Sequence, residues 1–377
     1  MKNGLSKKQS VMLQGIAIMM MLYHHLFSTP DALGIGYTSL LSFIGDEAEL
    51  RLAWFFKICV GIYAFITGYG MVRSYAIARK QEISENFGLF HSKCETGFLK
   101  TLVINYKVSL KKLGQFYLFF YWPVFIIYMA VGFIFFKKEF LIGEFLLNLL
   151  GISSSYNGAW WYVLQYVKML LTLPVIDACF VYYKDKKDRI TAIVIAVAGI
   201  ITCAILYFLP TRNALLRAIE FFQPAYYLCF IIGFLISRFC LYELADLILD
   251  KYLPKVIYII LAICAIIVVM ALRIHMAKDA SSAGFDFIFV PVFIFGAGYL
   301  LSFEGPIAKA LSFIGSLSTY MWLIHVFYYD HYAKNIVMFS HFSLGIYLTL
   351  LLMSGLSAYI FKTLIGKVIK SVKIRKR

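Results

Sequence analysis

The chain has 377 residues, of which 62% are hydrophobic and only 15% are charged, and its mean hydropathy is +0.79. Soluble domains have about 25% charged residues, so this composition excludes a soluble enzyme, a disordered chain and a disulfide-stapled secreted module. The apolar runs are continuous rather than alternating, which excludes a transmembrane β-barrel. The net charge of +16 lies mainly between and after these runs, which indicates membrane orientation rather than nucleic-acid binding.

Runs of about 20 apolar residues predict membrane-spanning helices. We expect an all-α polytopic membrane protein with about ten spans, which form a single membrane domain over residues 1–377. The expected spans are 11–29, 52–72, 113–136, 159–183, 190–209, 221–237, 255–274, 285–303, 310–329 and 342–361. The first run lacks a small-residue cleavage site, which favours a retained helix over a signal peptide. Segment 139–151 is too short to span and is expected to lie at one membrane surface.

The distribution of Lys and Arg predicts the orientation of these spans. With both termini in the cytoplasm, the inner segments carry roughly four times as many Lys and Arg residues as the outer segments, which is the bias that inner loops show. The longest inner loop would be 73–112. The chain would end in a short basic tail, 362–377, which suits contact with anionic lipids.

The first span carries unusual polar residues. Gln14 and His25 are eleven residues apart, which places them on nearly the same helix face with a rise of about 16 Å between them. Gln14 would lie near the cytoplasmic end of this stripe and His25 near the outer end, whereas His24 points about 100° away. Polar groups inside a membrane are costly and mark candidate functional residues. The simpler alternative is that the two histidines bond neighbouring helices.

Other polar groups are expected at the depth of His25, near the outer ends of their spans. They are Lys57, Trp160, Trp161, Glu220, Asp286 and His325. A neutral histidine in such a layer can act as a general base on an alcohol. Taken singly, the tryptophans suit an aromatic belt and Lys57 suits snorkelling.

Three lysines directly precede the third expected span on the cytoplasmic side. Lys107, Lys111 and Lys112 either bind the phosphates of a nucleotide-like cosubstrate or only set the orientation of the helix. The seven cysteines are scattered and show no metal-ligand spacing, so we expect no metal site.

Four segments, in order, resemble the integral-membrane acyltransferase-3 family. The hallmark of that family is a basic residue, ten residues and then His, and here this pattern falls on Gln14 and His25. The other three segments are Phe55–Tyr69, Trp160–Tyr166 and Ile314–His325. Together the four segments span nearly the whole chain.

The chain also departs from the family pattern at three places. Position 14 is Gln instead of a basic residue, and Thr67 replaces a serine. Lys111 and Lys112 stand where the family has paired arginines. A glutamine still donates hydrogen bonds, but without charge assistance.

The resemblance implies transfer of an acyl group, usually acetyl, from acyl-CoA to a hydroxyl group. The acceptor would be a cell-surface polysaccharide, a lipid-linked sugar or a small molecule, and the location would be a bacterial plasma (inner) membrane. Acyl-CoA would be a substrate, with no permanently bound cofactor. The expected partners are therefore acyl-CoA, the acceptor and the lipid bilayer.

The resemblance makes His25 the catalytic residue and Gln14 its partner on the donor side. We expect His325, Lys57 or Glu220 to orient the acceptor or stabilise the oxyanion. The remaining candidates for substrate binding are His24, Trp160, Trp161, Tyr166, Lys107, Lys111, Lys112 and Tyr320. The alternative from another class is a non-enzymatic exporter of a glycan or an acylated metabolite, which the glutamine at position 14 favours slightly.

Overall fold

The computed structural model describes residues 4–30, 36–87, 97–182, 223–277 and 284–374, together with the single positions 34, 190 and 194. This part of the chain is helical, and its β-structure is limited to one bridge between Thr38 and Phe342. Seven described helices are long and apolar enough to cross a membrane, and the number is eight if one bent helix pair counts as a span. The prediction of a polytopic α-helical membrane protein is therefore confirmed.

Seven of the ten expected spans match these helices. The seven observed helices are Lys7–Phe27, Ala48–Glu82, Phe98–Phe135, Gly158–Tyr182, Lys255–Met276, Pro306–Tyr332 and Ser343–Ser371. The expected span 190–209 lies almost entirely outside the described residues. The span expected at 221–237 corresponds to α11 (Pro224–Arg238), which bends by 61° into α12 (Leu241–Tyr252). The span expected at 285–303 is the shorter helix α14 (Asp286–Leu300).

The helices also extend beyond the apolar runs. Most of the expected loop 73–112 is helical, because α4 (Ile58–Phe87) and α5 (Phe98–Phe116) extend into it. The expected tail 362–377 is likewise mostly helix, since α17 continues from Ser343 to Ile374. Lys, Arg and Glu are good helix formers, so charged turns at the end of an apolar run remain helical. Segment 139–151 contains only the short helix α7 (Ile142–Leu149).

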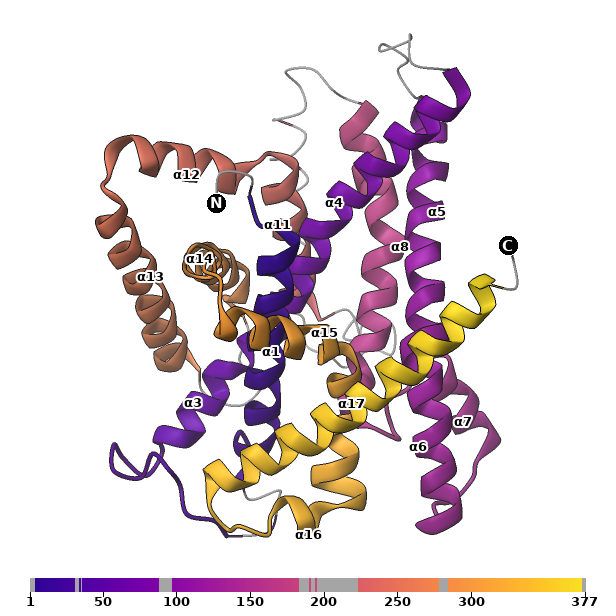
Figure 1. Cartoon of the computed structure of the whole chain (residues 1–377), viewed down its shortest axis with the longest axis vertical. Helices are drawn as coiled ribbons and strands as arrows, with labels where there is room; N and C mark the ends of the chain where they lie inside the picture. The colour runs from indigo at the N-terminus through magenta and orange to yellow at the C-terminus, as the bar shows by residue number, and fades with distance from the viewer. Residues whose placement is uncertain are drawn as a thin grey trace.

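The centre of the molecule is a pair of helices, α1 (Lys7–Phe27) and α15 (Pro306–Val326), which Figure 1 shows close together. A glycine from each helix allows the two backbones to touch. A Cβ atom at Gly315 would lie 1.8 Å from the Val11 carbonyl oxygen, and one at Gly15 would lie 2.4 Å from the Leu311 carbonyl oxygen. Neither position therefore accepts a larger residue without a shift of the helices.

A second glycine contact joins α4 to α11. A Cβ atom at Gly68 would lie 2.0 Å from the carbonyl oxygen of Phe230, and one at Gly233 would lie 2.2 Å from that of Phe65. Small residues allow this close approach of membrane helices. The contact fixes α4 closely against α11.

The second expected span is interrupted at Lys57, between α3 (Ala48–Phe56) and α4. Side chains from other helices donate hydrogen bonds to the carbonyl groups at the end of α3. The Nδ1 of His24 lies 2.8 Å from the Ala53 carbonyl oxygen, and Arg273 of α13 (Lys255–Met276) donates to the carbonyls of Trp54 and Phe55. These bonds satisfy carbonyl groups that a helix end would otherwise leave unpaired.

Candidate functional site

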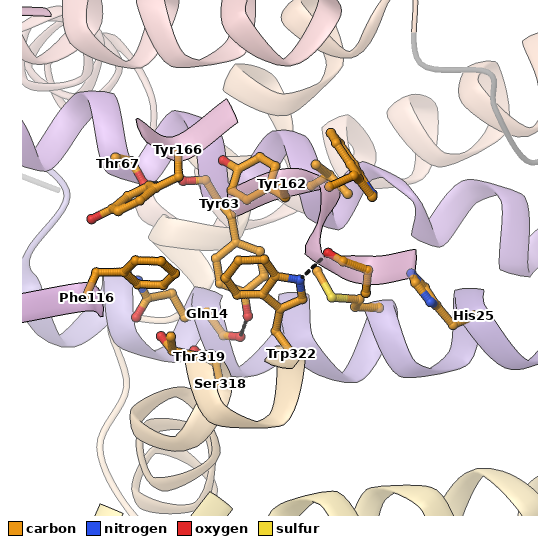
Figure 2. Close-up of a pocket in the computed structure, with 14 residues that line it drawn as sticks. Gln14, His25, Tyr63, Thr67, Phe116, Tyr162, Tyr166, Ser318, Thr319 and Trp322 are labelled. Carbon is orange, nitrogen blue, oxygen red and sulfur yellow. Dashed lines mark hydrogen bonds between the residues drawn. The ribbon is translucent and has the colours of Figure 1, made fainter. Parts of the chain in front are cut away.

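A narrow cavity runs beside α1 and is bordered by α4, α5, α8 (Trp161–Tyr182) and α15. Its volume is about 170 Å³, and a cavity of about 150 Å³ holds one benzene molecule. Figure 2 shows His25 at one end of the labelled lining residues, with Phe116 and Thr67 at the other end. The lining residues are Gln14, Met21, His25, Val60, Tyr63, Thr67, Phe116, Ala159, Trp161, Tyr162, Tyr166, Ser318, Thr319 and Trp322.

The stripe expected on the first helix does face this cavity. Gln14, Met21 and His25 all line it, and the rise from Gln14 to His25 is about 16 Å. A volume of about 170 Å³ along that length describes a small, elongated space, which suits an extended chain.

The His25 end of the cavity is built by two histidines and a tyrosine. The Nδ1 of His25 lies 3.3 Å from the Nε2 of His325 and 3.3 Å from the hydroxyl oxygen of Tyr329. His325 is fully buried, whereas His25 remains partly accessible because its ring borders the cavity. Sequence reasoning brought the two histidines to a similar depth but did not identify Tyr329.

The backbone fixes the tautomers of this histidine pair. The Nδ1 of His325 lies 2.8 Å from the Trp322 carbonyl oxygen and 3.2 Å from that of Met321, and a carbonyl oxygen only accepts hydrogen bonds. In neutral His325 the proton is therefore on Nδ1, and Nε2 is an acceptor. A hydrogen bond between the two rings then requires the Nδ1–H of His25 as donor, and in that tautomer the lone pair on Nε2 of His25 is its basic site.

The last turn of α15 is held in place from outside the helix. α15 passes directly into a π-helix, η3 (Phe327–Tyr332), and π-helical turns are frequent at functional sites. The Leu323 carbonyl accepts from Trp160 Nε1 at 3.0 Å and from the Asn157 side-chain amide at 3.2 Å. These bonds anchor the turn that carries His325.

The other end of the cavity is polar but uncharged. The Gln14 side-chain amide lines the cavity and has no hydrogen-bond partner within the described part of the chain. The Tyr63 hydroxyl donates to the Gln14 carbonyl oxygen at 3.0 Å, as the dashed line between them in Figure 2 marks. Thr67 donates to the Tyr63 carbonyl oxygen at 2.8 Å, so its hydroxyl oxygen is still able to accept a bond.

Several lining residues were not identified from the sequence. They are Tyr63, Phe116, Tyr162, Ser318, Thr319 and Trp322. A usable signal was the spacing of four residues within otherwise apolar helices, since residues four apart share a helix face. Tyr63 with Thr67, and Tyr162 with Tyr166, follow this spacing and face one cavity.

The structure brings only part of the predicted substrate-binding set to the cavity. Gln14, Trp161 and Tyr166 line it. Three other aromatic or imidazole side chains are buried and bond to backbone carbonyls instead, because those carbonyls lie at helix ends or π-helical turns. These are His24 on Ala53, Trp160 on Leu323 and Tyr320 on Phe119. Their role in this structure is to hold helices together.

The predicted charged residues also lie outside the cavity lining. Lys57 occupies the break between α3 and α4. Lys107 and Lys111 are exposed on α5, whereas Lys112 is half-buried one turn before the lining residue Phe116. Glu220 lies outside the described residues.

Asp286, which was expected in the polar layer, forms a buried ion pair. Arg273 Nε donates to Asp286 Oδ1 at 2.6 Å, and Arg273 Nη2 donates to Oδ2 at 3.1 Å. Arg273 and Asp286 are 3% and 1% exposed. Arg273 also donates to the carbonyl of Phe55 at 2.9 Å. The pair therefore joins α13 and α14 to the end of α3, to which His24 also bonds.

Comparison with known proteins adds no relative. No protein-family model, curated protein or solved structure matches the chain.

Proposed function

We propose that the protein is a membrane-bound O-acyltransferase that moves an acyl group, usually acetyl, from acyl-CoA to a hydroxyl group. The observation that supports this most directly is the position of His25 at one end of a narrow cavity, with its Nδ1 held by His325. A histidine with a fixed tautomer and a free lone pair is suited to general base catalysis.

The lining of the cavity suits a chain that carries amide groups. Hydroxyl and amide groups from Gln14, Tyr63, Thr67 and Ser318 border it, whereas a cavity for a lipid tail would need only apolar walls. The pantetheine arm of acyl-CoA is such a chain. It would extend from Gln14 to His25, over about 16 Å, and bring the thioester to the imidazole.

The chemistry follows from the two imidazoles. The acceptor hydroxyl gives its proton to Nε2 of His25 while its oxygen attacks the thioester carbonyl carbon. The tetrahedral intermediate then collapses by breaking the C–S bond, and His25 returns the proton to the departing thiolate. The products are an ester and free CoA. His325 holds the ring of His25 in the productive tautomer throughout.

In this proposal both termini lie in the cytoplasm and the donor enters from that side. The acceptor is a cell-surface polysaccharide, a lipid-linked sugar or a related hydroxyl compound at the opposite face of the plasma membrane. Membership of the acyltransferase-3 family belongs to the same proposal and rests on the four sequence segments that include Gln14 and His25.

The test uses purified protein in nanodiscs, radiolabelled acetyl-CoA and a crude glycan fraction as acceptor. Wild-type protein is expected to transfer label, and His25→Ala is expected to lose about 10²–10⁴-fold in rate. His275→Ala, which removes an exposed histidine of α13, is the matched control and should retain full rate. Equal transfer by His25→Ala would refute the proposal. Movement of a glycan into vesicles without acetyl-CoA would instead support the exporter.

A further inference from the structure

Tyr329 and His325 form a two-ring wall against the edge of His25. Their rings stack with centroids 5.9 Å apart and an interplanar angle of 28°. The ring of His25 stands edge-on to both, at 71° to His325 and 83° to Tyr329. One nitrogen of His25, Nδ1, lies 3.3 Å from the Nε2 of His325 and 3.3 Å from the hydroxyl oxygen of Tyr329.

Only one placement of the proton on His25 satisfies both contacts. The Nε2 of His325 is an acceptor, because the Nδ1–H of that ring faces backbone carbonyls. A proton donated by Tyr329 to the Nδ1 of His25 would leave two lone pairs facing each other across the contact with His325. A proton on the Nδ1 of His25 instead faces two acceptors, since a phenol oxygen can accept as well as donate. The oxygen of Tyr329 is then the second acceptor for this N–H group.

The contact with Tyr329 becomes stronger when His25 is charged. In the proposed reaction the Nε2 of His25 takes the proton of the acceptor hydroxyl, and the ring becomes an imidazolium. A charged donor forms a hydrogen bond about twice as strong as a neutral one, and an interaction that is stronger in the transition state than in the ground state raises kcat. Tyr329 is not among the described residues that line the cavity, so this effect reaches the substrate through His25.

We propose that Tyr329 is a positioning residue, whose hydroxyl oxygen accepts from the Nδ1–H of His25 and stabilises the imidazolium that forms during acyl transfer. The inference rests on the proposed function and adds to it a residue that acts through His25. The proton that moves leaves the acceptor oxygen, resides on Nε2 of His25 and passes to the departing thiolate. The proton on Nδ1 and that of the Tyr329 hydroxyl both stay in place.

Steady-state kinetics in nanodiscs give the first test. Tyr329→Phe keeps the stacked ring and removes only the hydroxyl, and we expect kcat to fall about tenfold with an unchanged KM for acetyl-CoA and an unchanged unfolding temperature. Tyr359→Phe, which removes the hydroxyl of an exposed tyrosine of α17, is the matched control and should retain the wild-type kcat. A wild-type kcat in Tyr329→Phe would overturn the inference, whether or not KM changes.

A double variant separates this role from simple packing. Without His325 no acceptor fixes the proton of His25 on Nδ1, so Tyr329 can donate its own proton there and hold the other proton on Nε2. The hydroxyl then no longer helps the base, and Tyr329→Phe should not lower kcat further in a His325→Ala background. An equal tenfold loss in both backgrounds would show that Tyr329 acts independently of the histidine pair, which contradicts the inference.

Nitrogen NMR tests the placement of the proton without any turnover. In protein that contains isotope-labelled histidine, the signals of His25 are those absent from His25→Ala. We expect a protonated Nδ1 and an unprotonated Nε2 in wild-type protein, and a changed Nδ1 shift in Tyr329→Phe. A proton on Nε2 of resting wild-type His25 would refute the inference.

Failure of the proposed function would look different. A protonated Nδ1 whose shift depends on Tyr329, in protein that transfers no acyl group, would refute the function and keep the hydrogen bond between His25 and Tyr329.

Discussion

The Nδ1 of His25 lies 3.3 Å from the Nε2 of His325, at one end of two helices that also touch through Gly15 and Gly315. Both contacts join residues that are 300 positions apart, so α1 and α15 run side by side in the same direction over ten residues. The glycine contact sets how closely the helices pack, and this spacing brings the two imidazoles within hydrogen-bond reach.

Loss of His325 should lower the turnover number without changing donor binding. In His325→Ala the tautomer of His25 is no longer fixed, and we expect kcat to fall by about 10²-fold with an unchanged KM for acetyl-CoA. His325→Gln offers a carbonyl oxygen as acceptor to His25 and should retain part of the rate. Steady-state kinetics in nanodiscs provide the test. A raised KM with normal kcat would instead make His325 a donor-binding residue.

Gly315→Ala should destabilise the protein. The added methyl group would meet the Val11 carbonyl oxygen, and overpacking of this kind costs about 1–3 kcal/mol. We expect a lower unfolding temperature and a loss of acyl transfer, since the histidines separate when the helices do. Gly355→Ala in α17 is the matched control, because a Cβ there has no neighbour within 4 Å. Equal unfolding temperatures for the two variants would show that α1 and α15 tolerate a wider spacing.

Asp286→Asn should be far more harmful than loss of a surface ion pair. Removal of one partner from a buried pair costs about 3–5 kcal/mol, because the other charge is left uncompensated. The exposed pair Glu47–Arg51 spans 2.8 Å, and Glu47→Gln should cost less than about 1 kcal/mol. Unfolding by titration with SDS measures both changes. A similar cost for the two variants would mean that water reaches Arg273.

A positive charge at position 14 should improve the use of acetyl-CoA. Gln14 lines the cavity away from the His25 end, and a charged donor bonds phosphate about twice as strongly as a neutral one. Gln14→Arg is expected to raise kcat/KM for acetyl-CoA several-fold and to leave that for S-acetyl-pantetheine unchanged. Competition between the two thioesters in one assay measures the ratio directly. An equal change for both would place the phosphates elsewhere.

Periodicity predicted the features that depend on one helix alone. Seven expected spans match long apolar helices, and the eleven-residue spacing placed Gln14 and His25 on the face that borders the cavity. The ends of helices were less predictable. Hydropathy detects where apolar residues stop, but charged turns of α4, α5 and α17 remain helical beyond that point.

Features that join distant helices were not predictable from one sequence. Nothing near Gly15 or Gly315 indicates that they meet, because each is the single glycine of its helix and forms no GxxxG pattern. Trp160 and Trp161 are neighbours with the same chemistry, yet one bonds to α15 and the other lines the cavity. That difference depends on the direction in which α8 begins, which is set by packing.

The histidine pair ends on a backbone carbonyl. Within the described part of the chain, no carboxylate contacts either imidazole, and His325 donates to Trp322 instead. A carbonyl is a dipole and stabilises an imidazolium less than a full negative charge does. A positive charge on His25 would therefore be short-lived, and the proton must pass on quickly. Such a base suits acyl donors with a good leaving group, so thioesters should react well and oxygen esters or amides hardly at all.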